Sequence, residues 1–240
     1  MDQTRFAVIG LGGIGTLLLN TLSRYINSLG PPTRNILLVD GDEYELKNQC
    51  RQDFVDFGKK ALIKAEELGE KFPSIDFEIF GQFITRDNVQ VLDGSDIIFL
   101  CVDNHKTRKV VSDYCKLRSD VLLISGGNEL ESGNVQVYFR REGKDVTPSL
   151  TCYHPEIENP QDKSPDEMSC EELSKSEPQL LFTNLTVATI MTWTLHNYCK
   201  VNYEQNELSE IYFDINRMKV DSKVRKIKTN MEEICTTRQL

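Results

Sequence analysis

Residues 5–15 decide the fold, and they read Arg-Phe-Ala-Val-Ile-Gly-Leu-Gly-Gly-Ile-Gly. A short apolar strand over residues 5–10 passes into a glycine loop, and residues 12–29 then follow the period of a helix. The loop fits the pattern G-x-G-x-x-G in the strand-to-helix setting that a phosphate-binding loop requires. Its glycines let the backbone approach a phosphate, and the start of a helix offers unpaired N–H donors and the positive end of a dipole. This stretch therefore predicts a nucleotide-binding unit.

Outward from this loop, strands and helices alternate along the chain. A turn at residues 30–32 leads to a second buried strand, residues 36–40, which completes a βαβ unit with a right-handed crossover. This alternation predicts an α/β fold with a doubly wound, Rossmann-like, mainly parallel sheet. The remaining elements expected in this region are helices over residues 59–71 and 106–117, strands over 77–80, 96–102 and 121–125, and a strand over 133–139 after a turn at Gly126-Gly127.

The composition changes after Thr147. Residues 148–178 contain five prolines and many acidic and serine residues without apolar periodicity, so they predict a long loop. A buried apolar helix is expected over residues 180–199, followed by a strand at 211–215 and a polar, lysine-rich tail. The 240 residues suit one α/β domain. Its expected parts are a nucleotide-binding core at residues 1–145, a crossover loop at 146–178, and a C-terminal helix and strands at 179–240.

Composition and charge argue against several classes of protein. Hydrophobic residues make up 39% and charged residues 27%, as in ordinary globular domains, and the net charge of −9 argues against general nucleic-acid binding. The basic run at residues 217–228 is interpreted as a solvated strand edge, with docking of an acidic partner as the alternative. The threonines within residues 180–199 argue against a membrane span.

The cysteines and the N-terminus predict a cytoplasmic location. The seven cysteines are odd in number, widely spread and never form a C-x-x-C pair, which favours a reduced protein without structural zinc. The chain passes from Met1 into an apolar strand without the features of a cleavable export signal.

Taken alone, the glycine loop indicates only that the chain binds some adenine nucleotide. Asp40 ends the second strand, where a carboxylate is placed to accept hydrogen bonds from ribose hydroxyls. A nicotinamide-dependent oxidoreductase is therefore the first alternative. Residues 40–52 argue against it, because they form a dense polar segment where a nicotinamide domain begins its next helix.

Five motifs in a fixed order carry a more specific signal. They are the glycine loop, Asp40-Gly41-Asp42, Asn48-x-x-Arg51-Gln52, Gly58-Lys59-Lys60-Ala61, and Cys101-x-Asp103-Asn104 with Arg108 following. In these motifs the sequence resembles the ThiF-like adenylyltransferases, the family that includes the molybdopterin- and thiamin-pathway activators and the ubiquitin-activating enzymes, and within it the bacterial ThiF-like proteins. Ser125-Gly126-Gly127 and the strand after it also resemble the family, so the resemblance covers roughly residues 5–139.

The resemblance implies that the chain binds ATP and Mg²⁺ and adenylates a C-terminal carboxylate. Attack of a carboxylate on the α-phosphate crowds negative charge and expels pyrophosphate, so cations and a metal ion are what the reaction needs. By the resemblance, Arg51 and one lysine contact the phosphates and Asn48 orients them. Asp103 holds Mg²⁺, although an N-cap of the following helix is its simpler interpretation. The implied nucleotide-binding residues are Gly10, Gly12, Gly13, Gly15, Asp40, Asp42, Asn48, Arg51, Gln52, Lys60, Asp103 and Asn104.

Two details depart from the family pattern. The usual Gly-x-x-Lys-Ala is one residue shorter here, so Lys60 is the expected phosphate contact, with Lys59 and Lys64 as alternatives. Many relatives also have an N-terminal arginine that reaches into the partner subunit's site, and Arg5 is the candidate for that role here.

A cysteine nucleophile is expected in the long loop. Members of the family that go beyond adenylation transfer the acyl group to a thiol, and cysteine suits this because its thiolate is available near neutral pH. Cys170 is the expected nucleophile, since its Ser-Cys segment resembles that of bacterial relatives, and Cys152 is the alternative. The neighbouring Glu171 and Glu172 would raise the pKa of the Cys170 thiol, while a helix N-terminus would lower it.

The resemblance also implies partners. The expected substrate is a small ubiquitin-like or sulfur-carrier protein of the β-grasp type that ends in glycine, with a conjugating or sulfur-transfer protein downstream. The apolar helix at residues 180–199 needs cover from the core or from another subunit, which predicts a homodimer. The alternative functions are a nicotinamide-dependent oxidoreductase and a catalytically inactive relative that only binds a partner.

Overall fold

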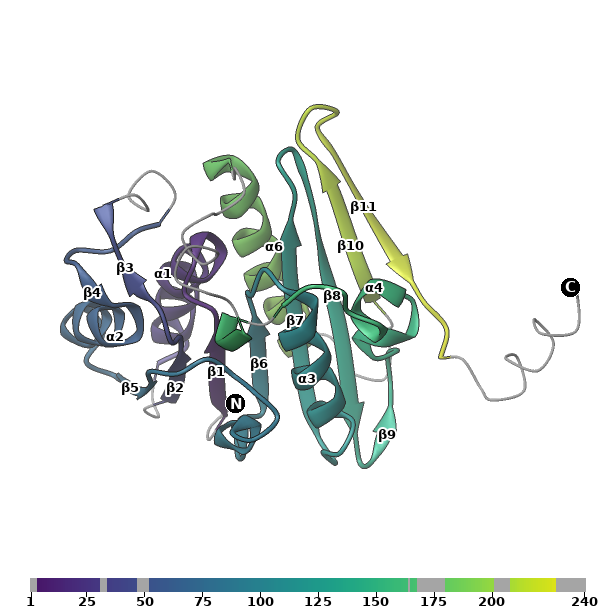
Figure 1. Ribbon diagram of the computed structural model, residues 1–240, viewed down its shortest axis with the longest axis horizontal. Helices are drawn as coiled ribbons and strands as arrows, with labels where there is room; N and C mark the ends of the chain where they lie inside the picture. The colour runs from purple at the N-terminus through teal and green to yellow at the C-terminus, as the bar shows by residue number, and fades with distance from the viewer. Residues whose placement is uncertain are drawn as a thin grey trace, which may run out of the picture.

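The computed structural model describes residues 4–30, 34–46, 52–163, 165–167, 180–200 and 208–227. Over these residues a nine-stranded sheet has helices on both faces (Figure 1). The strand order is β11-β10-β8-β7-β6-β1-β2-β5, and β9 pairs with β8 beside this path. The strands of this sheet are β1 (Arg5–Ile9), β2 (Arg34–Val39), β5 (Ile75–Phe80), β6 (Ile97–Leu100), β7 (Val121–Asn128), β8 (Ser132–Arg141), β9 (Lys144–Asp145), β10 (Leu208–Asp214) and β11 (Lys219–Val224).

Shorter elements and helices complete the described chain. A separate two-stranded sheet pairs β3 with β4. These two strands are β3 (Glu43–Tyr44) and β4 (Gly58–Lys59); the helices are α1 (Gly13–Ser28), α2 (Lys60–Lys71), η2 (Val89–Leu92), α3 (His105–Cys115), η3 (Leu150–Cys152), α4 (Pro155–Glu158), η4 (Pro165–Glu167) and α6 (Leu181–Lys200).

The parallel half of the sheet is doubly wound, as the sequence predicts. From β1 the chain moves outward to β2 and β5, and then returns to the other side of β1 to form β6 and β7, all in parallel. The direction of winding therefore reverses between β1 and β6. In open α/β sheets, ligands bind in the crevice outside the carboxyl ends of the strands at such a switch point.

Alternating side chains of each strand enter two separate cores. Phe6 and Val8 belong to the core shared with α1, α2 and α6, whereas Ala7 and Ile9 belong to the core shared with α3 and α4. This follows from the two-residue period of a strand, and it explains why β1 is continuously apolar. Figure 1 shows α3 and α4 on one face of the sheet and α1 and α6 on the other.

The expected turn at Gly126-Gly127 was wrong, because both glycines lie inside β7. The chain turns only between Asn128 and Ser132, and Gly126 pairs with Val135 of β8. Gly126 is needed for close packing, since a Cβ there would lie 2.4 Å from the sulfur of Met191 on α6. A glycine within a strand often marks such a close approach rather than a turn.

The antiparallel half of the sheet ends at β11. β7 is parallel to β6 but antiparallel to β8, and the pairs β8–β10 and β10–β11 are also antiparallel. All six residues of β11 are exposed. The basic run at residues 217–228 thus contains an edge strand, which ends at Val224, and the described chain continues to Ile227.

The helix α6 is buried on only one side. Residues such as Met191 and Leu195 are fully buried, but Phe182 and Trp193 are 67% and 58% exposed. The helix expected at residues 180–199 is thus present, and the core covers one side of it. Among the described residues, no helix has the length and apolar character needed to cross a membrane.

Candidate nucleotide site

The glycine loop lies at the switch point, against the end of β6. Gly10 has a φ of +87°, and a Cβ there would lie 2.9 Å from the carbonyl oxygen of Cys101. A Cβ on Gly15 would lie 1.9 Å from the carbonyl oxygen of Gly10, so the first turn of α1 approaches the loop as closely as backbone allows. Gly12 is the N-cap residue of α1, and as a glycine it has no side chain to accept hydrogen bonds from the first N–H groups of the helix. The first N–H groups of the helix are therefore available to an anion.

Asp40 joins the glycine loop to the end of β2. Its carboxylate accepts hydrogen bonds from the backbone N–H of Leu11 at 2.5 Å and of Asp42 at 2.8 Å. Burial raises the pKa of Asp40, against the opposing effects of Lys60 and of the two backbone hydrogen bonds. A carboxylate has about four lone-pair positions, so Asp40 retains capacity to accept ribose hydroxyls.

Of the three candidate lysines, Lys60 lies nearest to this carboxylate cluster. It begins α2, is 4% exposed, and places its ammonium 2.5 Å from Oδ2 of Asp42. Lys64 is fully buried one turn later, with its ammonium 2.6 Å from Glu67. Lys59 is exposed. Lys60 thus pairs with the acidic motif at the end of β2, whereas Lys64 pairs with an acid of its own helix.

Gln52 approaches the glycine loop from the next segment. A Cβ on Gly12 would lie 4.0 Å from Nε2 of Gln52. Gln52 is 8% exposed, and its buried Oε1 has no hydrogen-bond partner among the described residues. The predicted phosphate contacts Asn48 and Arg51 lie outside the described residues, as do Cys170 and its neighbours.

Asp103 and Asn104 follow the end of β6 at the same crevice. Asn104 is the N-cap of α3, since its side chain accepts a hydrogen bond from the backbone N–H of Thr107 at 2.8 Å. The simpler interpretation of Asp103 as that cap was therefore wrong. Asp103 is exposed. The buried Nδ2 of Asn104 has no partner among the described residues.

Arg108 fixes the floor of the crevice. Its guanidinium, 6% exposed, donates to Oγ of Ser125 at 2.5 Å and to the carbonyl oxygens of Val102 at 2.6 Å and Gly126 at 2.8 Å. Burial lowers the pKa of Arg108, and Cys101, Asp103 and Asp162 oppose this effect. Arg108 thus connects the chain just after β6 with residues 125–126 of β7. The motif contains this arginine, but its burial could not be read from the sequence.

The crossover segment, of which the structure describes residues 155–163 and 165–167, contacts the start of α3 at two points. The carboxylate of Asp162 accepts a hydrogen bond from the backbone N–H of His105 at 2.5 Å. Lys106 forms an ion pair with Glu167. Sequence reasoning missed both acids, because an acidic loop without periodicity gives no sign of which carboxylates it uses.

A cleft of about 260 Å³ lies between this segment and the loop that follows β5. Residues 84–86 form one wall, Thr107 and Val110 of α3 form another, and Pro160 closes it from the crossover segment. The same loop passes close to the residue after Asp40, since a Cβ on Gly41 would lie 2.7 Å from the backbone nitrogen of Phe83.

The alternative nucleophile, Cys152, is the last residue of η3 and is half-buried. The neighbouring Thr151 accepts a hydrogen bond from Lys116, the C-cap of α3, at 2.9 Å. Among the described residues, no cluster of three or more His, Cys, Asp or Glu side chains could hold a metal ion.

Comparison with known proteins finds one family along nearly the whole chain. The model of the ThiF family matches residues 1–237. The adenylyltransferase and sulfurtransferase MOCS3 of Danio rerio is 29% identical over 153 residues, which cover 62% of this chain and 31% of MOCS3. The tRNA threonylcarbamoyladenosine dehydratase of Haemophilus influenzae is 28% identical over 145 residues, covering 57% of this chain and 53% of the dehydratase.

A third relative is the ubiquitin-like modifier-activating enzyme 5 of Xenopus laevis, 30% identical over 149 residues, which cover 55% of this chain and 36% of that enzyme. The chain thus spans about a third to a half of the curated relatives that it matches. Solved structures match with fuller coverage. A crystal structure of E. coli MccB with ATP has a TM-score of 0.72 at 18% identity and covers 95% of this chain and 65% of MccB. This likeness shows the same fold.

Proposed function

This chain belongs to the ThiF family, and we propose that it uses ATP to adenylate a carboxylate. The observation that carries the proposal is the grouping of the glycine loop, Asp40, Lys60 and Asp103 around the switch point of the sheet. The relatives support this proposal, because MOCS3 is an adenylyltransferase and the Xenopus laevis protein is an activating enzyme.

The polar groups of the crevice fit a nucleotide. Oε1 of Gln52 is a buried acceptor and Nδ2 of Asn104 a buried donor, and both have no partner among the described residues. A buried polar group without a hydrogen bond costs about 1–3 kcal/mol, so a ligand that completes both is favoured. The N–H groups at the start of α1 suit phosphate oxygens, and Asp40 suits the ribose hydroxyls.

The cleft beside the crossover segment suits the base of this nucleotide. A ribose at Asp40 with its phosphates at the glycine loop would direct the base away from α1. In that direction lie Gly41, the loop of Phe83 and the apolar walls of Ile84 and Val110. Flat apolar walls with a few polar groups are typical of cofactor pockets.

Catalysis in this site would rest on positioning and charge. An oxygen of the carboxylate attacks the α-phosphorus, an acyl adenylate forms, and pyrophosphate leaves with the electron pair of the broken P–O bond. Lys60 would turn from Asp42 to the phosphates, together with Arg51. Asp103 would hold Mg²⁺, which when bound supplies neutralisation of the phosphate charge. Arg108 would keep Asp103 in place through the carbonyl oxygen of Val102.

The substrate that we propose is the C-terminal carboxylate of a small ubiquitin-like or sulfur-carrier protein. The names of the curated relatives support a small protein partner. A thioester on Cys170, or alternatively on Cys152, would follow adenylation before a conjugating or sulfur-transfer protein accepts the acyl group. We further propose a homodimer, supported by the exposed apolar side chains of Phe182, Leu185 and Trp193 along α6.

Exchange of labelled pyrophosphate into ATP tests this proposal. With candidate β-grasp proteins as carboxylate donors, the wild-type chain should catalyse exchange, and Asp103→Ala should lose at least about 100-fold because an electrostatic contribution is missing. Asp76→Ala is the matched control, since Asp76 is an exposed aspartate on β5 that does not line the cleft. Tighter binding of NAD than of ATP in calorimetry would support the oxidoreductase instead. ATP binding without any exchange would support an inactive, partner-binding relative.

A further inference from the structure

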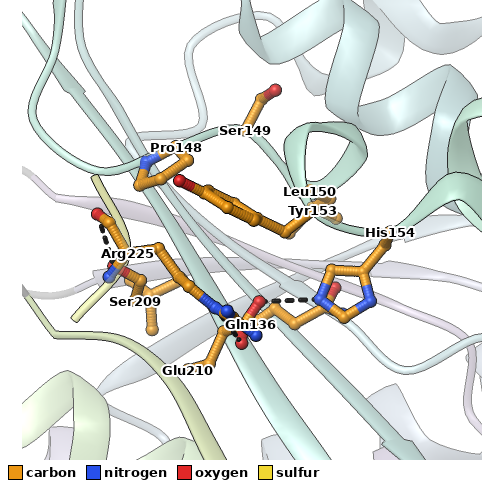
Figure 2. Close-up of a pocket in the computed structure, with 10 residues that line it drawn as sticks. Gln136, Pro148, Ser149, Leu150, Tyr153, His154, Ser209, Glu210 and Arg225 are labelled. Atoms are coloured by element: carbon orange, nitrogen blue, oxygen red, sulfur yellow. Dashed lines mark hydrogen bonds and ion pairs between the residues drawn. The ribbon is translucent and has the colours of Figure 1, made fainter. Parts of the chain in front are cut away.

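A histidine held between two carboxylates marks the beginning of the crossover segment, and Figure 2 shows its contact with one of them, Glu210. Nε2 of His154 lies 2.7 Å from Oε1 of Glu210 on β10, and its Nδ1 lies 2.9 Å from Oε1 of Glu156 on α4. The side chains of His154 and Glu210 are 12% and 5% exposed. Residue 154 is also the N-cap position of α4, so its side chain sits where the crossover segment begins.

The second oxygen of Glu210 is held from the other side. Oε2 accepts hydrogen bonds from the hydroxyl of Tyr212 at 2.6 Å and from Nε of Arg225 at 2.9 Å. The guanidinium of Arg225 lies 4.9 Å from the ring centre of Tyr153, whose hydroxyl donates to the carbonyl oxygen of Lys226 at 2.6 Å. Residues 153–156, β10 and the end of the β11 segment thus meet at one carboxylate.

The cavity at this cluster is too small for a substrate. Its volume is about 10 Å³. That is room for about one water molecule. Oε1 of Gln136, which lines the cavity, is buried without a partner among the described residues and is a suitable contact for such a water. The cluster is therefore better understood as a structural fastening than as a second binding site.

Both contacts of His154 require an imidazolium. A carboxylate is only an acceptor when ionised, whereas a neutral imidazole carries one N–H and a protonated imidazole carries two. Glu156 and Glu210 occupy opposite ring nitrogens, so the neutral ring satisfies only one of them. Deprotonation of His154 thus removes its hydrogen bond either to Glu156 on α4 or to Glu210 on β10.

Loss of one of these hydrogen bonds would affect the segment that lines the cleft proposed for the nucleotide. From His154 the chain runs through α4 to Pro160, which lines the cleft, and to Asp162, which accepts from the N–H of His105. Glu158 of α4 also pairs with Lys109 of α3 at 3.1 Å. These contacts hold the crossover segment against α3, and His154 fastens its upstream end to the sheet.

We propose that His154, as an imidazolium between Glu156 and Glu210, is a positioning residue that sets how the crossover segment lies beside the nucleotide cleft. This rests on the proposed function for its role in adenylation, although the fastening itself does not. The charged and titratable groups that face it are Glu156 on α4, Glu210 and Tyr212 on β10, and Arg225 after β11, with His105 of α3 acting on Glu156.

The electrostatics agree with the geometry. Burial by itself would lower the pKa of His154, but the hydrogen bonds and charges of Glu210 and Glu156 outweigh it and raise the pKa above the ordinary value of 6.5. Burial by itself would raise the pKa of Glu210, and its bonds to His154, Tyr212 and Arg225 lower it to about 2. Both shifts favour the charged form of the pair.

NMR of the wild-type protein tests the protonation state without any mutation. The chain has three histidines, so the ring signals of His154 can be assigned. Both ring nitrogens should carry a proton at pH 7, and the ring should titrate above 6.5. A ring that is neutral at pH 7 would overturn the proposal.

Hydrogen exchange tests the positioning role in the nucleotide-free protein. After correction for intrinsic rates, amides of residues 155–163 should exchange roughly tenfold faster or more in His154→Gln at pH 6.5, because local opening follows the lost charged contacts. The wild type should approach the variant once pH exceeds the pKa of His154. His196→Gln is the control, since His196 contacts Tyr25 on the opposite face of the sheet. Unchanged exchange in His154→Gln would overturn the positioning role.

A pyrophosphate-exchange assay separates this inference from the proposed function. If the chain adenylates, His154→Gln should raise the KM for ATP more than it lowers kcat, since the residue touches neither reactant. Equal loss in kcat with an unchanged KM would argue against positioning. Absence of exchange in the wild type would contradict the adenylation proposal, whereas the NMR and hydrogen-exchange results would still decide the fastening.

Discussion

The ammonium of Lys60 lies 2.5 Å from the carboxylate of Asp42, so this lysine is already neutralised by the motif that precedes it. A triphosphate would have to compete with this acid for the lysine. The competition favours ligands of high negative charge, because a single phosphate offers little more than Asp42 does. We therefore expect the pair to favour ATP over AMP.

Substitution of the three lysines should separate their roles. Lys60→Ala should reduce pyrophosphate exchange by about 100-fold or more, because a phosphate contact is lost. Lys59→Ala should leave it nearly unchanged, since Lys59 is exposed. Lys64→Ala should instead lower the free energy of unfolding by about 3–5 kcal/mol, because Glu67 is left without its buried partner. An exchange defect confined to Lys64→Ala, with stability preserved, would assign the phosphate contact to Lys64.

Gly15 should not tolerate a methyl group. In Gly15→Ala the new Cβ would lie 1.9 Å from the carbonyl oxygen of Gly10, so the loop and α1 must separate and ATP binding should be lost. Gly69→Ala is the matched control, because it lies in α2 with nothing near its Cβ position and should stabilise the protein by about 0.5–1 kcal/mol. Calorimetric ATP binding and urea unfolding measure the two effects. Normal ATP affinity in Gly15→Ala would contradict the loop assignment.

Arg108 should act on stability as well as on activity. Arg108→Met should lower the free energy of unfolding by about 3–5 kcal/mol, because the carbonyl oxygens of Val102 and Gly126 lose a charged donor inside the sheet. Arg86→Ala should change stability by less than about 0.5 kcal/mol, as expected for an exposed side chain. Denaturant titration measures both, and equal stabilities would show that the clamp at the ends of β6 and β7 contributes nothing.

The stabilising effect of the His154 cluster should depend on pH in a defined direction. The pKa of His154 is raised, so its contribution is complete below 6.5 and is lost as pH rises through the folded-state pKa. The pKa of Glu210 is lowered to about 2, so its contribution is present above 4.5 and is lost as pH falls towards 2. The stability difference between wild type and His154→Gln, about 1–3 kcal/mol, should therefore be largest between these limits. A difference that grew above pH 8 would have the wrong sign.

The proposed dimer predicts a specific defect on α6. Trp193→Glu should shift the mass in light scattering from twice 27.5 kDa to 27.5 kDa, because a charge would be buried against the second copy. Met218→Glu is the control, since Met218 is 90% exposed in the turn between β10 and β11. A wild-type monomer at micromolar concentration would overturn the dimer.

The sequence predicted the winding of the parallel sheet because apolar strands and glycine turns are local signals. It misplaced the turn at Gly126-Gly127, since nothing local indicates that Met191 of α6, far along the chain, requires a glycine in the strand. The same limit applies to the site. Asp40 follows from its strand end, but the contact of Asp162 with the start of α3 depends on how a loop without periodicity folds back.

Asp40 links two recognition events that are usually considered separately. The carboxylate that would bind the ribose also holds the N–H groups of Leu11 and Asp42, and so shapes the loop that would bind the phosphates. Removal of this side chain therefore cannot report on the sugar alone. A chemical change in the nucleotide can, because 2′,3′-dideoxy-ATP leaves the protein intact while omitting both hydroxyls. The affinity lost by that analogue measures what the two hydroxyls contribute to binding, because the glycine loop keeps its hydrogen bonds to Asp40.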